Sequence, residues 1–131
     1  MKEKLIEAAK DAMKHAYVPY SRFPVGVALV TKEGAIFKGC NIENAAYSVC
    51  NCAERTALFK AYSEGEKAFA ALAVVANSDR PISPCGACRQ VMSELCDPDM
   101  PVYLANLKGD VIETVVRQLL PNAFSGKDLG Q

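Results

Sequence analysis

The residues of this chain best suited to chemistry are three cysteines and one glutamate. Cys85 and Cys88 are three residues apart, so at the start of a helix their sulfurs lie on one face and can chelate one ion. Cys52 lies 33 residues upstream and can supply a third sulfur if two helix N-termini meet. Helix N-termini also lower the pKa of a thiol, which favours the thiolate that a metal needs.

Three protein ligands leave the fourth tetrahedral position of a zinc ion for water, which distinguishes a catalytic zinc site from a structural one. Glu54 follows Cys52 by two residues and is placed to take a proton from that water and pass it to a leaving group. Cys50 is the rival ligand, and a closed four-cysteine structural site is the alternative. We favour Cys52 because Cys50 has no glutamate two residues further on. Cys40, Cys50 and Cys96 are then interpreted as packing residues.

Three thiolates on Zn²⁺ leave a net negative charge, which weakens the metal as a Lewis acid. We hypothesise that Arg55 donates hydrogen bonds to one or two of the ligand sulfurs and, with the two helix dipoles, restores the acidity of the bound water. Arg89 is interpreted as an ordinary cation on a helix surface. His15 is the only histidine and is also interpreted as a surface residue.

Composition narrows the class of protein. The chain has 131 residues with 15 basic and 15 acidic side chains, and we expect one domain over residues 1–131. Zero net charge argues against a nucleic acid polymer or an anionic membrane as partner. The longest apolar run, Ala68–Ala76, is under half of a membrane span, and the charged N-terminal residues lack the pattern of a leader. These features predict a cytoplasmic protein with reduced cysteines.

Helical and strand periodicities alternate along the chain and indicate an α/β protein, with a mostly buried sheet covered by helices. We expect helices at Lys2–Tyr17, Ala53–Ser63, Cys85–Leu95 and Val116–Leu120. We expect strands at Val25–Thr31, Ala35–Gly39, Ala68–Ala76, Pro101–Leu107 and Val111–Val115. The first two strands form an antiparallel hairpin through the turn at Lys32–Gly34, and Pro19 ends the first helix.

Cys52-Ala53-Glu54 and Pro84-Cys85-Gly86-Ala87-Cys88 fit the zinc deaminase signature of a ligand, one residue and a glutamate, followed by Pro-Cys-x-x-Cys. Over its whole length the chain resembles the small, homotetrameric-type cytidine deaminases. The matching stretches are Pro19–Gly26, Gly39–Tyr47, Cys52–Ala57, Pro84–Gln90 and Leu119–Phe124.

The resemblance implies a three-layer α/β/α fold with a mixed five-stranded sheet, a homotetramer and one Zn²⁺ per subunit. It implies hydrolytic deamination of cytidine and deoxycytidine to uridine and deoxyuridine, with release of ammonia, in pyrimidine nucleoside salvage. A free nucleoside is expected as the substrate because the sequence has no basic or glycine-rich phosphate cradle.

The resemblance also implies the substrate contacts. Asn41 and Glu43 are two apart in an extended segment, so they point the same way and can bind ribose hydroxyls. The other implied contacts are Phe23 on the pyrimidine ring, the backbone of Ala53 on the base, and Tyr47 and Phe124 completing or supporting sites across subunit contacts. The alternatives for these side chains are ordinary packing, turn or surface roles.

Two other functions stay open from the sequence. One is a related small zinc deaminase that acts on another aminopyrimidine such as blasticidin S. The other is a zinc-binding module without enzymatic activity. A deaminase that edits polynucleotides would need a basic groove, which the balance of charges does not suggest.

Overall fold

Two strands that are apolar on both faces form the centre of a five-stranded sheet. The computed structural model describes residues 1–131. Strands β1 (Val25–Thr31) and β3 (Phe69–Ala76) are buried almost throughout. With β2 (Ile36–Cys40), β4 (Pro101–Asn106) and β5 (Val111–Val115), they form a sheet of order β2-β1-β3-β4-β5. Only β3 and β4 pair in parallel, so the sheet is mixed, as expected.

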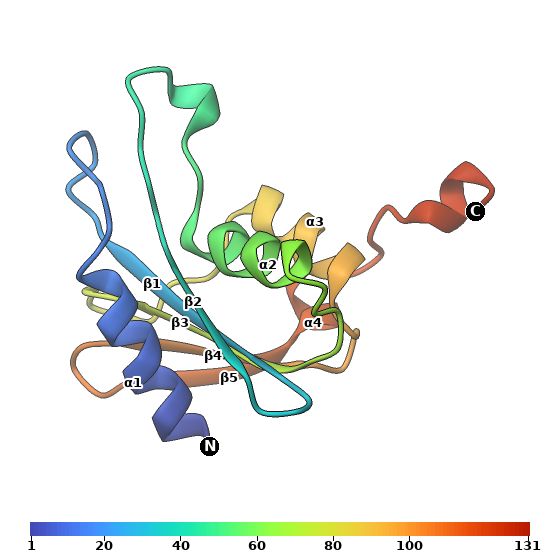
Figure 1. Cartoon of the computed structure of the whole chain (residues 1–131), viewed down its shortest axis with the longest axis horizontal. Helices are drawn as coiled ribbons and strands as arrows, with labels where there is room; N and C mark the ends of the chain where they lie inside the picture. The colour runs from blue at the N-terminus through green and yellow to red at the C-terminus, as the bar shows by residue number, and fades with distance from the viewer.

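Helices cover both faces of this sheet and produce three layers (Figure 1). Helix α1 (Lys2–Met13) packs on one face, where the strands present mostly alanine and valine. Helices α2 (Ala53–Ser63), α3 (Gly86–Leu95) and α4 (Val116–Leu119) pack on the other face, against larger side chains. The alternation of side chains along each strand separates the two cores, and the expected α/β/α architecture is confirmed.

The strand directions bring the starts of two helices together. Strand β1 is antiparallel to both β2 and β3, so β2 and β3 run the same way. Helix α2 follows β2 and helix α3 follows β3, so both helices begin beyond the carboxyl ends of their strands, at one edge of the sheet. This edge is where α/β sheets form ligand sites.

A glycine on β2 lets α2 approach the sheet closely. A Cβ atom on Gly39 would lie 2.6 Å from the carbonyl oxygen of Ala53 and 2.6 Å from the amide nitrogen of Ala57. Such contacts are shorter than any that real side chains make, so a larger residue would displace the first turns of α2. Gly39 therefore allows the close approach that sets the position of the turn carrying Glu54.

The expected elements agree with the structure to within about a residue, with one exception. The first helix ends at Met13, so the expected end at Tyr17 is wrong. The amide of Tyr17 donates to the carbonyl of Asn41 at 3.0 Å, and Tyr17 forms an isolated bridge with Ile42. This distant partner removes Tyr17 from the helix before Pro19 is reached.

Two short 3₁₀ segments, at Tyr47–Val49 and Gly126–Leu129, complete the secondary structure. The second belongs to a C-terminal segment that extends away from the sheet and its helices (Figure 1). None of the helices has the length and apolar character needed to cross a membrane.

Candidate metal centre and active site

The structure places the three expected metal ligands in one cluster. The sulfur atoms of Cys52, Cys85 and Cys88 lie within 4.8 Å of one another, and those of Cys52 and Cys85 are 3.8 Å apart. A tetrahedral zinc ion with Zn–S bonds of about 2.3 Å requires its sulfur ligands to be about 3.8 Å apart. Cys52 and Cys85 are the N-cap residues of α2 and α3, so both face free backbone N–H groups.

The electrostatics of this cluster favour a thiolate. Hydrogen bonding from the Cys88 thiol, together with bonds from Arg55 and Cys85, lowers the pKa of Cys52 to about 5, although burial opposes the change. The same bond to Cys52 raises the pKa of Cys88. A soft donor set of three sulfurs with a stabilised thiolate suits zinc, so the residues present fit this metal.

Arg55 lies against the sulfur cluster. Its Nη2 atom donates to the sulfur of Cys52 at 3.3 Å, and this contact raises the pKa of Arg55. The Nε atom of Arg55 is buried without a hydrogen-bond partner. Burial of an unpartnered donor is costly, so the guanidinium is held in this position by the thiolate and the packing around it.

Glu54 is a buried carboxyl in the first turn of α2, with only 5% of its surface exposed. Burial, together with the negative charge of Cys52, raises the pKa of Glu54 to about 7. A carboxyl that titrates near neutral pH is suited both to accept and to return a proton.

Cys52, Cys85 and Glu54 border a small cavity of about 160 Å³. Asn41 and Ala53 also line it, so the structure brings these expected site residues together. The remaining lining residues are Val25, Ile82 and Ser83. The sequence interpretation missed Ser83, although its position two residues before Cys85 is a signal that could have identified it.

Asn41 is already bonded to the loop that carries Phe23. Its Oδ1 atom accepts from the amide of Val25 at 2.9 Å, and its Nδ2 atom donates to the carbonyl of Phe23 at 2.9 Å. Both polar atoms of the side-chain amide therefore hold the chain on either side of Pro24.

Glu43 holds the beginning of the same loop. Its carboxylate accepts from the amides of Tyr20 and Ser21, at 3.0 and 3.1 Å, and from the hydroxyl of Ser21. The hydroxyl bond lowers the pKa of Glu43. The loop needs such support because Arg22 has a positive φ of 56°, which is costly for a residue with a side chain.

The three aromatic residues expected at the site do not line the cavity beside Glu54. Phe23 is 37% exposed, Tyr47 72% and Phe124 58%. Tyr47 and Glu43 line a separate hollow of about 310 Å³ together with Tyr20, Ser21 and Cys50. Phe124 precedes the 3₁₀ segment Gly126–Leu129, and its carbonyl accepts from the Nε2 atom of Gln90 on α3 at 3.1 Å.

Cys50 and Arg89 also have partners in the structure. The sulfur of Cys50 accepts from the amide of Asn44 at 3.2 Å, and Cys50 lies outside the cluster of three sulfurs.

The interpretation of Arg89 as an ordinary surface cation is wrong. Its guanidinium donates to three oxygens of the surrounding chain, because α3 places it between the loop before Cys85 and the end of α4.

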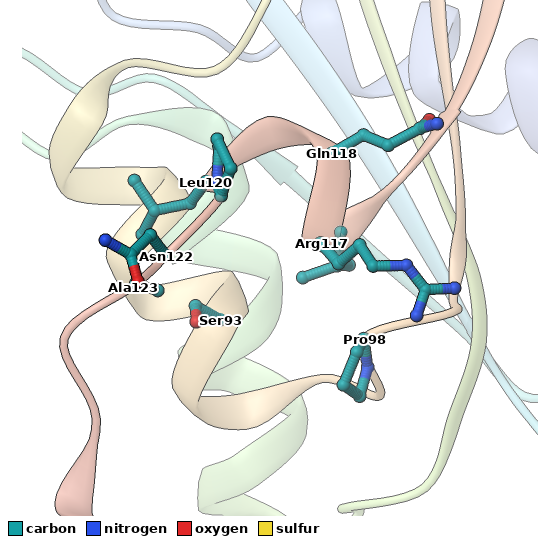
Figure 2. A pocket seen from close by; sticks show the side chains of 9 residues that line it. Ser93, Pro98, Arg117, Gln118, Leu120, Asn122 and Ala123 are labelled. Atoms are coloured by element: carbon teal, nitrogen blue, oxygen red, sulfur yellow. The ribbon is translucent and has the colours of Figure 1, made fainter.

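A larger hollow of about 480 Å³ lies elsewhere on the molecule, between α3, α4 and the segment that follows α4. Figure 2 shows Ser93 on α3, Arg117 and Gln118 on α4, and Asn122 on that segment. None of the three cluster cysteines, nor Glu54, lines it. The chemistry therefore belongs to the smaller cavity.

Known proteins with the same sequence pattern support this assignment. The family model for the cytidine and deoxycytidylate deaminase zinc-binding region matches residues 1–104. A cytidine deaminase of Sporosarcina psychrophila is 64% identical over 127 residues, which cover 97% of this chain and 93% of that protein. A blasticidin-S deaminase of Bacillus cereus is more distant, at 32% identity over 92% of this chain and 90% of its own length.

The fold is shared with a solved structure. The crystal structure of cytidine deaminase from Burkholderia pseudomallei superimposes with a TM-score of 0.93 at 57% sequence identity. The match covers 95% of this chain and 99% of that one. The sulfur cluster, the glutamate beside it and these similarities agree, and the chain belongs to the cytidine and deoxycytidylate deaminase zinc-binding family.

Proposed function

We propose that this protein is a zinc-dependent hydrolase that converts cytidine and deoxycytidine, with water, to uridine and deoxyuridine and ammonia. The observation that carries the proposal is the buried Glu54 beside three cysteine sulfurs at the meeting point of two helix N-termini. The nucleoside specificity is supported by the 64% identical cytidine deaminase. The function belongs to pyrimidine nucleoside salvage.

In this proposal Cys52, Cys85 and Cys88 hold one Zn²⁺ per subunit. When bound there, a zinc ion would supply an activated water. Glu54 would take one proton of this water as its oxygen adds to C4 of the base, and would pass that proton to N3. Glu54 would then carry the second proton from the added hydroxyl to the amino group, so that the C4–N bond breaks, one water is consumed and one ammonia leaves.

The remaining site residues orient the nucleoside. The backbone of Ala53 contacts the base, Asn41 and Glu43 bind ribose hydroxyls, and Phe23 packs on the pyrimidine ring. The bonds that Asn41 and Glu43 make to residues 20–25 give them a second task, because they also fix the loop that carries Phe23.

We also propose that the protein works as a homotetramer in the cytoplasm. Several large apolar side chains are exposed, which is typical of an interface; they are Tyr17, Tyr20, Ile42, Tyr47, Val49, Phe59 and Phe124. Tyr47 and Phe124 lie outside the cavity of their own chain, which suits a role at a neighbouring subunit's site. Six free cysteines fit a reducing compartment.

Replacing Glu54 with glutamine removes the proton carrier but keeps the shape of the side chain. We expect kcat for cytidine to fall by at least about 10²-fold, while zinc content stays at one ion per chain. The measurements are loss of cytidine absorbance and metal analysis, with Glu94→Gln on the exposed face of α3 as the matched control. A Glu54→Gln protein with normal turnover would contradict the proposed role of Glu54. A zinc-loaded parent protein that leaves both cytidine and deoxycytidine intact would contradict the proposed function. That result would hold against the proposal whether the protein is a blasticidin S deaminase or a zinc-binding module without activity.

Arg55→Gln tests the compensation of charge at the sulfurs. Loss of the hydrogen bond to Cys52 leaves more negative charge on the metal ligands, so we expect kcat to fall about 10- to 100-fold with zinc still bound. Arg80→Gln, which removes an exposed arginine, is the control. Unchanged kinetics in Arg55→Gln would refute the hypothesis.

Asn41→Ala separates direct binding of ribose from support of the loop. If Asn41 contacts a ribose hydroxyl, KM for cytidine should rise about 3- to 10-fold, and the rise should be much smaller for 2′,3′-dideoxycytidine, which lacks those hydroxyls. Glu43→Gln gives the same comparison at the second position. An equal loss for both substrates would mean that these side chains act only through the loop that carries Phe23.

The proposed assembly has a simple physical test. Light scattering on the purified protein should give a mass about four times the 14.1 kDa of the chain. A monomeric mass at micromolar concentration, together with full deaminase activity, would show that neither Tyr47 nor Phe124 needs a neighbouring subunit.

A further inference from the structure

Arg89 joins two parts of the chain that are far apart in sequence. Its Nε atom donates to the carbonyl of Pro84 at 2.7 Å and its Nη2 atom to the hydroxyl of Ser83 at 2.6 Å. Its Nη1 atom donates to the carbonyl of Leu119 at 2.8 Å. One guanidinium therefore connects the loop before Cys85 to the end of α4.

The geometry of these contacts requires arginine. Three nitrogen atoms in one plane donate to three separate oxygens, whereas a lysine ammonium on a flexible stem cannot reproduce this fork. Pro84 is buried, so its carbonyl needs a protein donor. The carbonyl of Leu119 is at the end of α4, where the helix itself provides no donor.

The contact with Pro84 acts directly on a metal ligand. The carbonyl of Pro84 and the amide of Cys85 belong to the same planar peptide unit, so fixing the oxygen fixes the orientation of that plane. The side chain of Cys85 leaves the backbone at the next atom. The amide of Arg89 also donates to the carbonyl of Cys85 at 2.9 Å, so Cys85 is held at both of its peptide groups.

The following residue extends this connection toward the C-terminal segment. The Nε2 atom of Gln90 donates to the carbonyl of Phe124 at 3.1 Å. Arg89 and Gln90 thus hold Leu119 and Phe124 against the start of α3, where two of the three sulfurs of the cluster are carried.

We propose that Arg89 is a positioning residue that fixes the orientation of Cys85 and couples the geometry of the sulfur cluster to residues 119–124. Arg55 acts on a sulfur through a hydrogen bond, whereas Arg89 acts on the backbone that carries one. Of the measurements that test this inference, only the one of deaminase activity rests on the proposed function.

The test uses Co²⁺ in place of zinc in the parent protein and in Arg89→Gln. Thiolate-to-cobalt absorption bands report the number and arrangement of the sulfur ligands and need no substrate. We expect Arg89→Gln to change the energy and intensity of these bands. We also expect its zinc affinity, measured by chelator competition, and its kcat/KM for cytidine to fall about 10- to 100-fold. Arg117→Gln, which removes the exposed arginine paired with Asp99, should leave all three unchanged.

Two further variants keep the inference falsifiable. Arg89→Lys retains the charge but not the fork, so we expect values between those of the parent and Arg89→Gln; parental values would show that charge alone matters and would overturn the proposal. Ser83→Ala removes one acceptor and keeps Arg89, so it tests the contact even if Arg89→Gln does not fold. A change of the cobalt bands in Ser83→Ala that is smaller than the change in Arg89→Gln, but in the same direction, supports the proposal.

Unchanged cobalt bands and zinc affinity in both Arg89→Gln and Ser83→Ala would overturn it, whatever happens to thermal stability. If Arg89→Gln cannot be prepared, unchanged values in Ser83→Ala alone would overturn it as well. Because the cobalt spectrum does not depend on substrate, a parent protein that binds Co²⁺ through its thiolates but fails to deaminate cytidine contradicts only the proposed function.

Discussion

Three cysteine sulfurs from two helices can meet only if both helices begin at the same place, and the sheet provides that place. Strand β1 runs against both β2 and β3, so α2 and α3 start at one edge, with Cys52 and Cys85 as their N-cap residues. The free N–H groups and helix dipoles at these starts favour negative charge. The fold thus supplies an environment for thiolates before any side chain beyond the cysteines is considered.

Charge balance explains the residues around the cluster. The guanidinium of Arg55 contacts the sulfur of Cys52, while burial raises the pKa of Glu54 to about 7. Two neighbouring residues of one helix turn therefore have different tasks. Arg55 stabilises the negative charge of a thiolate, whereas Glu54 can bind a proton and lose its own negative charge. Their difference follows from environment, because Arg55 contacts a sulfur and Glu54 loses its contact with water.

The elements that depend on local pattern could be predicted from the sequence. The apolar strand Val25–Thr31, the helix that begins at Ala53 and the spacing of Cys85 and Cys88 all carry their signal within a few residues. Features that depend on distant partners could not. Tyr17 lies outside the first helix because its amide donates to the carbonyl of Asn41. Arg89 donates to the carbonyl of Leu119, which is thirty residues further along the chain. No local periodicity contains information about such contacts.

The carboxylate of Glu43 already uses its hydrogen-bonding capacity on Tyr20 and Ser21. A sugar hydroxyl that reaches Glu43 therefore exchanges one set of bonds for another rather than satisfying an empty acceptor. The net free energy of such an exchange is small compared with either bond alone. Under the proposed function, recognition of the sugar at this position would depend on selectivity more than on affinity, because a ligand that fails to replace the lost bonds gains nothing in exchange.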